Sequence, residues 1–162
     1  MQVMNTHLND GAFPHDPSMT EAFAPLYAAD PVVPQTAHLR AVVIGGGAAG
    51  MMAAVAAGRR GHRVTLLEKN EKLGKKIYIT GKGRCNFTNA CDVEQLFGAV
   101  VSNPKFLYSA IYGFDNSMTM EFFREMGMPW KVERGNRVFP VSDHSSDVTK
   151  ALERAMDQAG VK

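Results

Sequence analysis

Three glycines and one glutamate carry the first chemical signal in this chain of 162 residues. The glycines have the spacing Gly45-x-Gly47-x-x-Gly50, and Glu68 follows 18 residues after the last of them. A glycine turn that opens a helix presents unpaired backbone N–H groups, which bind phosphates with the help of the positive end of the helix dipole. A nearby carboxylate accepts hydrogen bonds from hydroxyl groups. The pattern therefore predicts a ligand that carries both phosphate and hydroxyl groups.

The elements that must position these residues are a strand, a helix and a second strand. Residues 40–44 are apolar and β-branched, as in a strand buried on both faces, residues 48–60 are rich in Ala and Met, and residues 63–67 are again apolar. A crossover this short joins parallel strands. The first glycine then allows the tight turn, the second lets the backbone approach a pyrophosphate, and the third lets helix and strand pack closely. The sequence predicts a Rossmann-like α/β fold that binds a dinucleotide, with Glu68 at the adenosine ribose and against a 2′-phosphate.

The rest of the chain continues the alternation of loops and elements. Residues 68–89 are polar, basic and rich in glycine, which predicts a long loop that faces the ligand. Helices are expected at 104–112, at 117–126 with a cap-like Ser-x-x-x-Glu start, and at 145–159 with Asp143 or Ser145 as the cap; a hairpin is expected from 130–133 and 137–141. A third strand should follow at Val161. We expect a chain truncated before that third parallel strand.

Charge and cysteine content set weaker limits. Residues 1–39 contain four acidic groups and no Lys or Arg, so residues 40–162 hold 18 basic against 12 acidic groups, a surplus that suits a pyrophosphate and equally a nucleic acid. Five prolines lie between Pro14 and Pro34, and we expect residues 1–39 to be a flexible extension. The two cysteines lack C-x-x-C spacing, and the N-terminus lacks the pattern of a signal peptide. A cytoplasmic location is expected.

Several blocks of the sequence resemble a known bacterial family. They are residues 45–54, 66–69, 74–77, 137–143 and, most specifically, Thr80-Gly-Lys-Gly-Arg-Cys-Asn-Phe-Thr-Asn89. They resemble flavoproteins described as NAD(P)/FAD-dependent oxidoreductases, of the aminoacetone oxidase-like or bile-acid-dehydroxylation-associated type. The likeness covers about residues 40–162 and implies that they are the N-terminal part of an FAD-binding domain.

The resemblance implies FAD as cofactor, hydride or electron transfer as chemistry, and NAD(P)H as a transient electron donor. The cofactor-binding residues that we expect are Gly45, Gly47, Ala48, Ala49, Gly50, Glu68, Lys69, Lys75, Gly81, Gly83, Arg84, Cys85 and Asn86. No catalytic acid or base and no substrate can be named. Members of the family are more than twice as long as this chain, so the alternative is a non-catalytic, truncated nucleotide-binding fragment.

Other functions compete for some of the same residues. Six basic residues between Lys69 and Arg84 could line an RNA surface, but no aromatic residues alternate with them, and we expect no nucleic acid. The uncharged run 41–58 could be scored as a membrane helix, but its three successive glycines disfavour one, and we expect no membrane contact.

Cys85 and His144 carry two further alternatives. Cys85, beside Arg84, could be a redox thiol, whereas packing or proximity to the cofactor is the simpler reading. His144 lies next to Asp143 and near Asp147, which could form a metal site, but these residues also fit the cap of a helix. We expect no metal.

Overall fold

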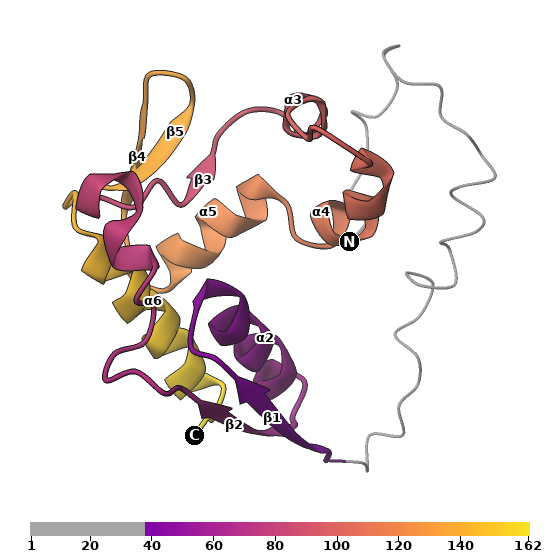
Figure 1. Ribbon diagram of the computed structural model, residues 1–162, viewed down its shortest axis with the longest axis vertical. Helices are drawn as coiled ribbons and strands as arrows, with labels where there is room; N and C mark the ends of the chain where they lie inside the picture. Colours follow the sequence, from indigo (N-terminus) through magenta and orange to yellow (C-terminus); the bar gives the residue numbers. More distant parts are fainter. Residues whose placement is uncertain (1–37) are drawn as a thin grey trace, which may run out of the picture. The chain divides into compact units, whose positions relative to one another are not determined.

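The computed structural model describes residues 38–162 (Figure 1). Its first unit consists of strand β1 (Arg40–Ile44), helix α2 (Ala48–Arg59) and strand β2 (Arg63–Leu67). The two strands are parallel and in register from Arg40 opposite Arg63 to Ile44 opposite Leu67. The strand–helix–strand unit that the sequence predicts is therefore confirmed, and its α/β, Rossmann-like character with it.

The sheet is covered on one face only within the described residues. Exposure alternates along β1 and β2, so that Val64 is 3% exposed against α2 whereas Ile44 is 85% exposed. Our expectation that the first strand is buried on both faces is wrong for these residues. An apolar β-branched run gives the same sequence signal whether one or two layers cover it, because the signal reports side-chain type and not the neighbours.

Backbone pairing continues at the other edge of β2. The backbone N–H of Lys162 donates to Val64 O at 3.0 Å, and Leu66 N–H donates to Lys162 O at 2.6 Å. This is the pattern of a parallel partner strand, at the place where a third strand was expected. Helix α6 (Ser145–Gln158) leads to it and crosses close to α2, where a Cβ on Gly58 would lie 2.6 Å from Ala159 O.

A second, antiparallel sheet has the strand order β3-β5-β4. Its strands are β3 (Thr88–Asn89), β4 (Trp130–Glu133) and β5 (Arg137–Pro140). The β4–β5 hairpin is confirmed as predicted around Gly135 and Asn136. Strand β3 was not expected, since two residues carry no period that a pattern can detect.

Within residues 38–162, one helical segment joins the two sheets, and four more lie between β3 and β4 of the second sheet. They are the 3₁₀ helices η1 (Ile77–Gly83) and η2 (Pro104–Leu107) and the α-helices α3 (Val93–Gly98), α4 (Tyr108–Gly113) and α5 (Asn116–Glu125). The expected helix 104–112 thus consists of η2 followed by α4, while η1 and α3 were missed. The cap of α5 is Asp115, which accepts from Met118 N–H at 2.7 Å, and not Ser117 as expected.

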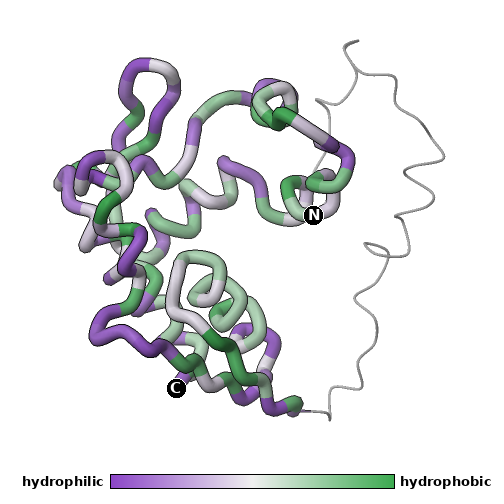
Figure 2. The backbone as a smooth tube through the Cα atoms, viewed as in Figure 1, coloured by the Kyte–Doolittle hydropathy of each residue, from purple (hydrophilic) through white to green (hydrophobic). Residues whose placement is uncertain are grey.

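One connected core holds these elements together. It contains side chains from α2, β2, the 80–86 region, α5 and α6, and the largest fully buried ones include Met51, Val55, Met128 and Leu152. Figure 2 shows the hydrophobic positions along β1, β2 and α2, and the hydrophilic run that follows β2. No helix within residues 38–162 is both long and apolar enough to cross a membrane.

The turn between β1 and α2 sets the geometry of the first unit. Gly45 has φ +102°, a conformation that favours glycine, and its N–H donates to Leu67 O at 2.7 Å. A Cβ on Gly50 would lie 1.9 Å from Gly45 O, whereas a Cβ on Gly47 would meet no heavy atom within 4 Å. The third glycine is therefore required for packing and the second is not.

We expect Gly50→Ala to destabilise the domain by about 1–3 kcal/mol or more, because the methyl group must push the Gly45 carbonyl aside. Gly47→Ala should cost less than about 1 kcal/mol, because Gly47 has φ −80° and free space around it. Urea unfolding of both variants measures the difference. Equal losses of stability would contradict this division of roles.

Candidate functional site

The glycine turn places the start of α2 at the carboxyl end of β1. Gly47 is the N-cap, with an extended backbone and no side-chain cap, and the first turn of the helix contains no acidic residue. Ala48 and Ala49, which follow it, are both exposed. The N–H groups and positive dipole end of a twelve-residue helix thus face a surface with no protein carboxylate on the helix itself. Such a helix start can bind an anion.

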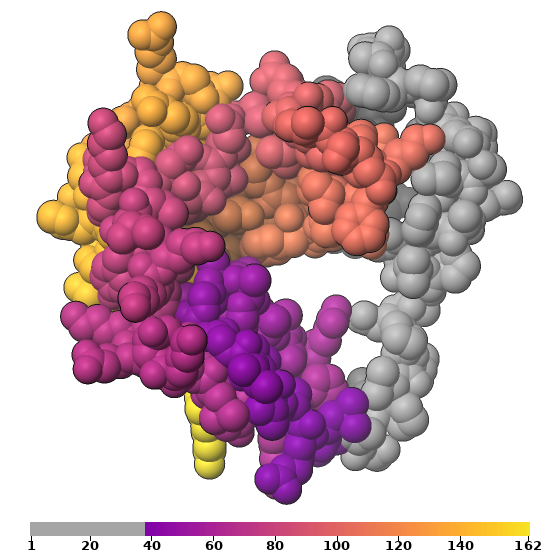
Figure 3. All heavy atoms as spheres, viewed as in Figure 1, coloured from indigo at the N-terminus to yellow at the C-terminus, as the bar shows by residue number. Residues whose placement is uncertain are grey.

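Gly46 is a site residue that our sequence analysis missed. It is buried, and a Cβ there would lie 2.2 Å from Leu73 Cδ2. Its carbonyl accepts from Gly74 N–H at 2.7 Å, so the segment after β2 lies across the turn. Figure 3 shows this segment, in magenta, against the indigo start of the domain. The sequence signal that could have identified Gly46 is the uninterrupted run of three glycines at 45–47, because the G-x-G-x-x-G spacing uses only the first and the third of them.

The Glu68 carboxylate lies beside the same turn. Its Oε2 accepts from Gly46 N–H at 2.6 Å, and its Oε1 accepts from Asn70 N–H at 2.8 Å and from the Asn70 side-chain amide. Hydrogen bonds from the backbone N–H groups of Asn70 and Gly46 hold the pKa of Glu68 below its ordinary value. The group is therefore ionised at neutral pH, and Oε2 still has a lone pair for a further donor.

A pocket of about 380 Å³ opens next to Glu68. Its lining also includes the carboxylates Glu153 and Asp157, one cation, Lys162, and the apolar side chains of Leu66, Leu73, Met156 and Val161. The three carboxylates outnumber the single lysine, so the net negative charge disfavours a phosphate there, whereas a neutral ring with N–H donors is compatible with this lining.

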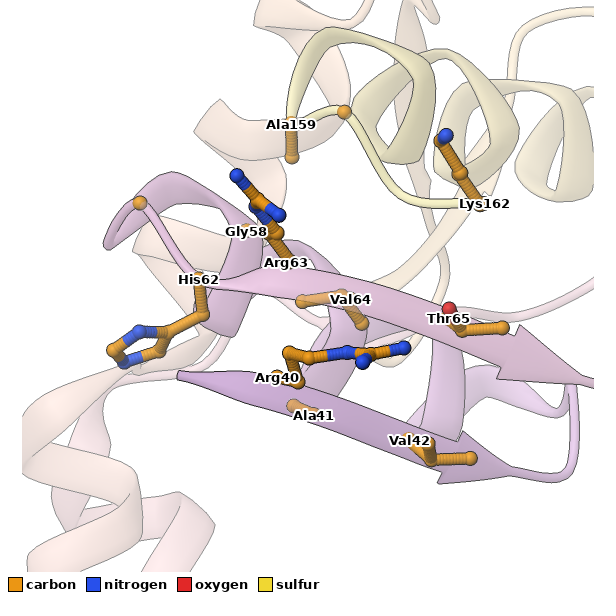
Figure 4. Close-up of a pocket in the computed structure, with 12 residues that line it drawn as sticks. Arg40, Ala41, Val42, Gly58, His62, Arg63, Val64, Thr65, Ala159 and Lys162 are labelled. Carbon is orange, nitrogen blue, oxygen red and sulfur yellow. The ribbon is translucent and has the colours of Figure 1, made fainter. Parts of the chain in front are cut away.

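A larger pocket of about 700 Å³ lies at the opposite end of the strands (Figure 4). Arg40 and Arg63, which begin β1 and β2, line it together with Lys162, and no carboxylate side chain is among the lining residues. Ligands of open α/β sheets bind at the carboxyl ends of the strands. Gly45 and Glu68 follow those ends, so the larger pocket is separate from the site predicted by the glycine motif.

The 80–86 loop contains five of the residues that we expected at the cofactor: Gly81, Gly83, Arg84, Cys85 and Asn86. The structure brings them against the second sheet. Arg84 forms ion pairs with Glu133 and Asp143, and Asn86 Oδ1 accepts from Val138 N–H at 3.2 Å. Whether any of the five contacts a cofactor stays a prediction. The two carboxylate partners of Arg84 were not foreseen, because they are 49 and 59 residues away in the sequence.

Cys85 is a buried thiol. It is 5% exposed and belongs to the apolar core, and this burial raises its pKa above the ordinary value. A protonated thiol is a poor nucleophile. Both Cys85 and Cys91 are free cysteines. The geometry supports packing over redox chemistry as the role of Cys85.

The residues around His144 were candidates both for the cap of helix α6 and for a metal site. His144, and not Asp143 or Ser145, is the N-cap of α6, and it makes no side-chain cap hydrogen bond. Asp143 instead binds Arg84 and Lys131, while Ser145 Oγ donates to Tyr78 O at 3.3 Å. Within residues 38–162 no three His, Cys, Asp or Glu side chains are grouped so that they could hold a metal ion.

Comparisons with known proteins identify the family of this chain. The family described as "HI0933-like protein Rossmann domain" matches residues 39–162. The chain is 40% identical over 123 residues to a 3-dehydro-bile acid delta(4,6)-reductase of Clostridium scindens, covering 74% of this chain and 29% of that protein. It is also 40% identical over 100 residues to the ribosomal RNA dihydrouridine synthase of Escherichia coli, covering 61% of this chain and 24% of that one. The chain thus spans less than a third of either relative.

A solved structure also aligns with most of this chain. The crystal structure of Thermovibrio ammonificans THI4 aligns with 93% of this chain and 45% of its own, at a TM-score of 0.46 and 14% identity.

The lowered pKa values of Glu68, Glu133 and Asp143 predict acid sensitivity. A carboxyl group whose pKa is lower in the folded than in the unfolded chain stabilises the fold above its unfolded value, here about 4.5 for Glu68, and this contribution is lost as the pH falls through the folded pKa. Thermal unfolding between about pH 6 and pH 3 should therefore depend less on pH in Glu68→Gln than in the parent chain. Glu71→Gln, at an exposed position, is the control and should keep the parent's pH dependence. Identical curves for Glu68→Gln and the parent would contradict the prediction.

Proposed function

The chain belongs to the HI0933-like Rossmann-domain family, and on that premise we propose that residues 40–162 bind FAD at the glycine turn for an oxidoreductase reaction. The extension that we expected at residues 1–39 lies outside the described residues up to position 37. One observation carries the proposal: the Glu68 carboxylate is hydrogen-bonded to the turn whose Gly47 faces open space.

The phosphate end of the site fits a pyrophosphate. The backbone at Gly47, Ala48, Ala49 and Gly50 begins α2, and Gly47 has no neighbour within 4 Å of where a side chain would be. A ligand can therefore approach the main chain there. The helix start supplies the N–H groups and the partial positive charge, and we propose that these hold the two phosphates of the cofactor.

The ribose end of the site fits Glu68. Its ionised carboxylate is oriented by Gly46 and Asn70, and Oε2 keeps a lone pair that can accept from a ribose hydroxyl. A fixed negative charge at this point repels a 2′-phosphate, which supports FAD or NAD over NADP as the resident ligand. The pocket beside Glu68 offers apolar walls and acceptors to the adenine ring.

The flavin end is assigned by the family likeness. We propose that Lys69, Lys75 and the 80–86 loop, with Gly81, Gly83, Arg84, Cys85 and Asn86, lie along the rest of the cofactor. FAD, when bound, supplies the hydride or electron transfer. The residues of this chain bind and orient it, and we assign none of them as an acid or a base.

The reaction of the whole protein is a further proposal, beyond the binding of FAD by residues 40–162. The two relatives at 40% identity are named for different substrates, a bile acid and a ribosomal RNA. Their equal identity to this chain does not separate the two. We propose a redox reaction on an organic substrate with NAD(P)H as the transient donor, and binding without catalysis as the alternative for this chain alone.

RNA is a second candidate partner, contrary to the expectation from sequence. Five of the six basic residues between positions 69 and 84 are exposed and have no carboxylate within 4 Å in the described part of the chain: Lys69, Lys72, Lys75, Lys76 and Lys82. Unpaired cations on one segment suit a polyanion. The ribosomal RNA relative favours this reading, and the lack of interleaved aromatic residues weighs against it.

The FAD proposal predicts distinct effects of two variants. Glu68→Gln should weaken FAD binding about 10-fold or more, because a hydrogen bond to a charged acceptor is worth about 1.5–3 kcal/mol. Gly47→Ala should weaken it as well while leaving stability nearly unchanged, because the new methyl group occupies the approach to the pyrophosphate. Quenching of FAD fluorescence on titration measures both affinities.

Glu71→Gln is the matched control for these titrations, since it also removes one carboxylate near the site but at an exposed position. Its affinity should equal that of the parent chain. Absence of FAD binding by the parent chain, or parental affinity in Glu68→Gln, would refute the proposed site.

The RNA candidate predicts salt-dependent binding of a labelled ribosomal RNA fragment, followed by fluorescence anisotropy. Replacing Lys75 and Lys76 together by Gln should reduce the slope of log affinity against log salt by about 2, roughly one for each phosphate contact. Lys105→Gln, at an exposed position on η2, should leave the slope unchanged. No binding at low salt would eliminate this candidate.

A further inference from the structure

Arg84 and three other charged side chains, from three segments of the chain, form one cluster. Its guanidinium contacts Glu133 at the end of β4 and Asp143 in the turn between β5 and α6. Lys131, also on β4, donates to Asp143 Oδ2 at 2.6 Å and lies 3.6 Å from Glu133. The two cations and two anions balance in charge, and their side chains are between 28% and 40% exposed.

The hydrogen bonds of Arg84 leave little for a ligand. Nε donates to Asp143 Oδ1 at 2.9 Å, Nη1 donates to Glu133 Oε2 at 3.2 Å, and Nη2 donates to both carboxylates. Four of the five guanidinium N–H groups are thereby used. One face of the guanidinium lies over the Phe139 ring, with Cζ 4.2 Å from the ring centroid.

The electrostatic interactions of Arg84 also disfavour the binding of a phosphate by its guanidinium. Hydrogen bonds from Arg84, to Glu133 first and Asp143 second, raise its pKa above its ordinary value. The bond from Arg84 lowers the pKa of Glu133, and bonds from Lys131 first and Arg84 second lower the pKa of Asp143. A phosphate that approached the guanidinium would meet two fixed negative charges at its side. Arg84 is thus a poor ligand for an anionic cofactor, although its motif suggests one.

The backbone on both sides of Arg84 has an unfavourable conformation that other contacts must stabilise. Lys82 and Cys85 flank it with φ of +57° and +59°, a region that non-glycine residues avoid. A Cβ on Gly81 would lie 2.8 Å from Asn86 N, so the two ends of the loop nearly touch. A conformation of this kind persists only when surrounding contacts fix it. Within the loop, Arg84 N–H donates to Gly81 O at 3.2 Å and Cys85 N–H donates to Thr80 O at 3.1 Å. The contacts that tie the loop to the rest of the domain include the Arg84 ion pairs, the Asn86 hydrogen bond and the burial of Cys85.

We infer that Arg84 is a positioning residue: its ion pairs with Glu133 and Asp143 fix the 80–86 loop so that the loop backbone, and not the guanidinium, faces the cofactor. The conformational half of this inference concerns the ligand-free chain. The cofactor half rests on the proposed function and deepens it.

The first test needs no ligand. We compare the backbone amide NMR shifts of Gly81, Lys82 and Gly83 in the parent chain, Arg84→Ala and Asp143→Asn. Both variants should move these three signals, Arg84→Ala more than Asp143→Asn, because the first removes both ion pairs of the loop and the second removes one. Arg124→Ala, which breaks an exposed ion pair with Glu121 on α5, is the matched control and should not move them. Unmoved loop signals in Asp143→Asn would overturn the inference.

The second test separates a positioning residue from a direct ligand. Positioning predicts that Arg84→Ala weakens FAD binding by about 10-fold, that Asp143→Asn weakens it less because Glu133 still pairs with Arg84, and that the double variant is no weaker than Arg84→Ala. Arg84→Lys should recover only part of the loss, because an ammonium cannot bridge two carboxylates in a fork. A direct ligand predicts parental or tighter binding in Asp143→Asn, in which one of the two carboxylates beside the guanidinium is removed, and that result would overturn the inference.

The outcomes also distinguish this inference from the proposed function. If the parent chain binds no FAD, the proposed function fails, while the NMR comparison still decides whether Arg84 fixes the loop. If both variants lower the melting temperature but leave FAD affinity and the loop signals unchanged, Arg84 has a purely stabilising role and the inference is refuted.

Discussion

The contact of Gly50 with the Gly45 carbonyl is the constraint on which the candidate site depends. It brings the first turn of α2 against the end of β1 so closely that no side chain fits between them. The start of the helix is then directed at the carboxyl edge of the two parallel strands. The Gly45 N–H bond to Leu67 O places the end of β2 at the same edge, and Glu68 follows it directly. The helix N–H groups that we propose to bind phosphate and the carboxylate that we propose to bind a ribose hydroxyl thereby become neighbours through backbone packing and hydrogen bonds.

The segment after β2 packs against the same glycine turn. Because Gly46 has no side chain, Leu73 and the Glu68 carboxylate can both lie against it, and Gly74 can donate to its carbonyl. From there η1 leads to the 80–86 loop, which is attached to the second sheet by Arg84 and Asn86. The two halves of the proposed cofactor site are thus fixed by different means, the first by close backbone contact and the second by charge pairs.

This division has a physical consequence for function. Close backbone contacts change little with pH, whereas the carboxylates of both halves lose their hydrogen bonds and ion pairs once they are protonated: Glu68 in the first half, Glu133 and Asp143 in the second. We therefore expect acid to weaken the Glu68 contact and the Arg84 ion pairs and to leave the contact between Gly45 and Gly50 unchanged. The charged side chains of the 80–86 loop are also exposed or partly exposed. We therefore expect this loop to open locally at a lower free energy than the buried core around Met51 and Leu152.

The sequence by itself determined the first βαβ unit, the β4–β5 hairpin, helix α6 and the roles of Gly45 and Gly50. These are local matters, since each depends on periodicity or on a conformation that few residues can adopt. Only the tertiary structure decided that residues 38–162 leave one sheet face uncovered, that Asp115 and not Ser117 caps α5, and that Arg84 is paired with Glu133 and Asp143. Burial, caps and ion pairs depend on which groups the fold brings together, and partners 49 and 59 residues apart leave no trace in the local pattern.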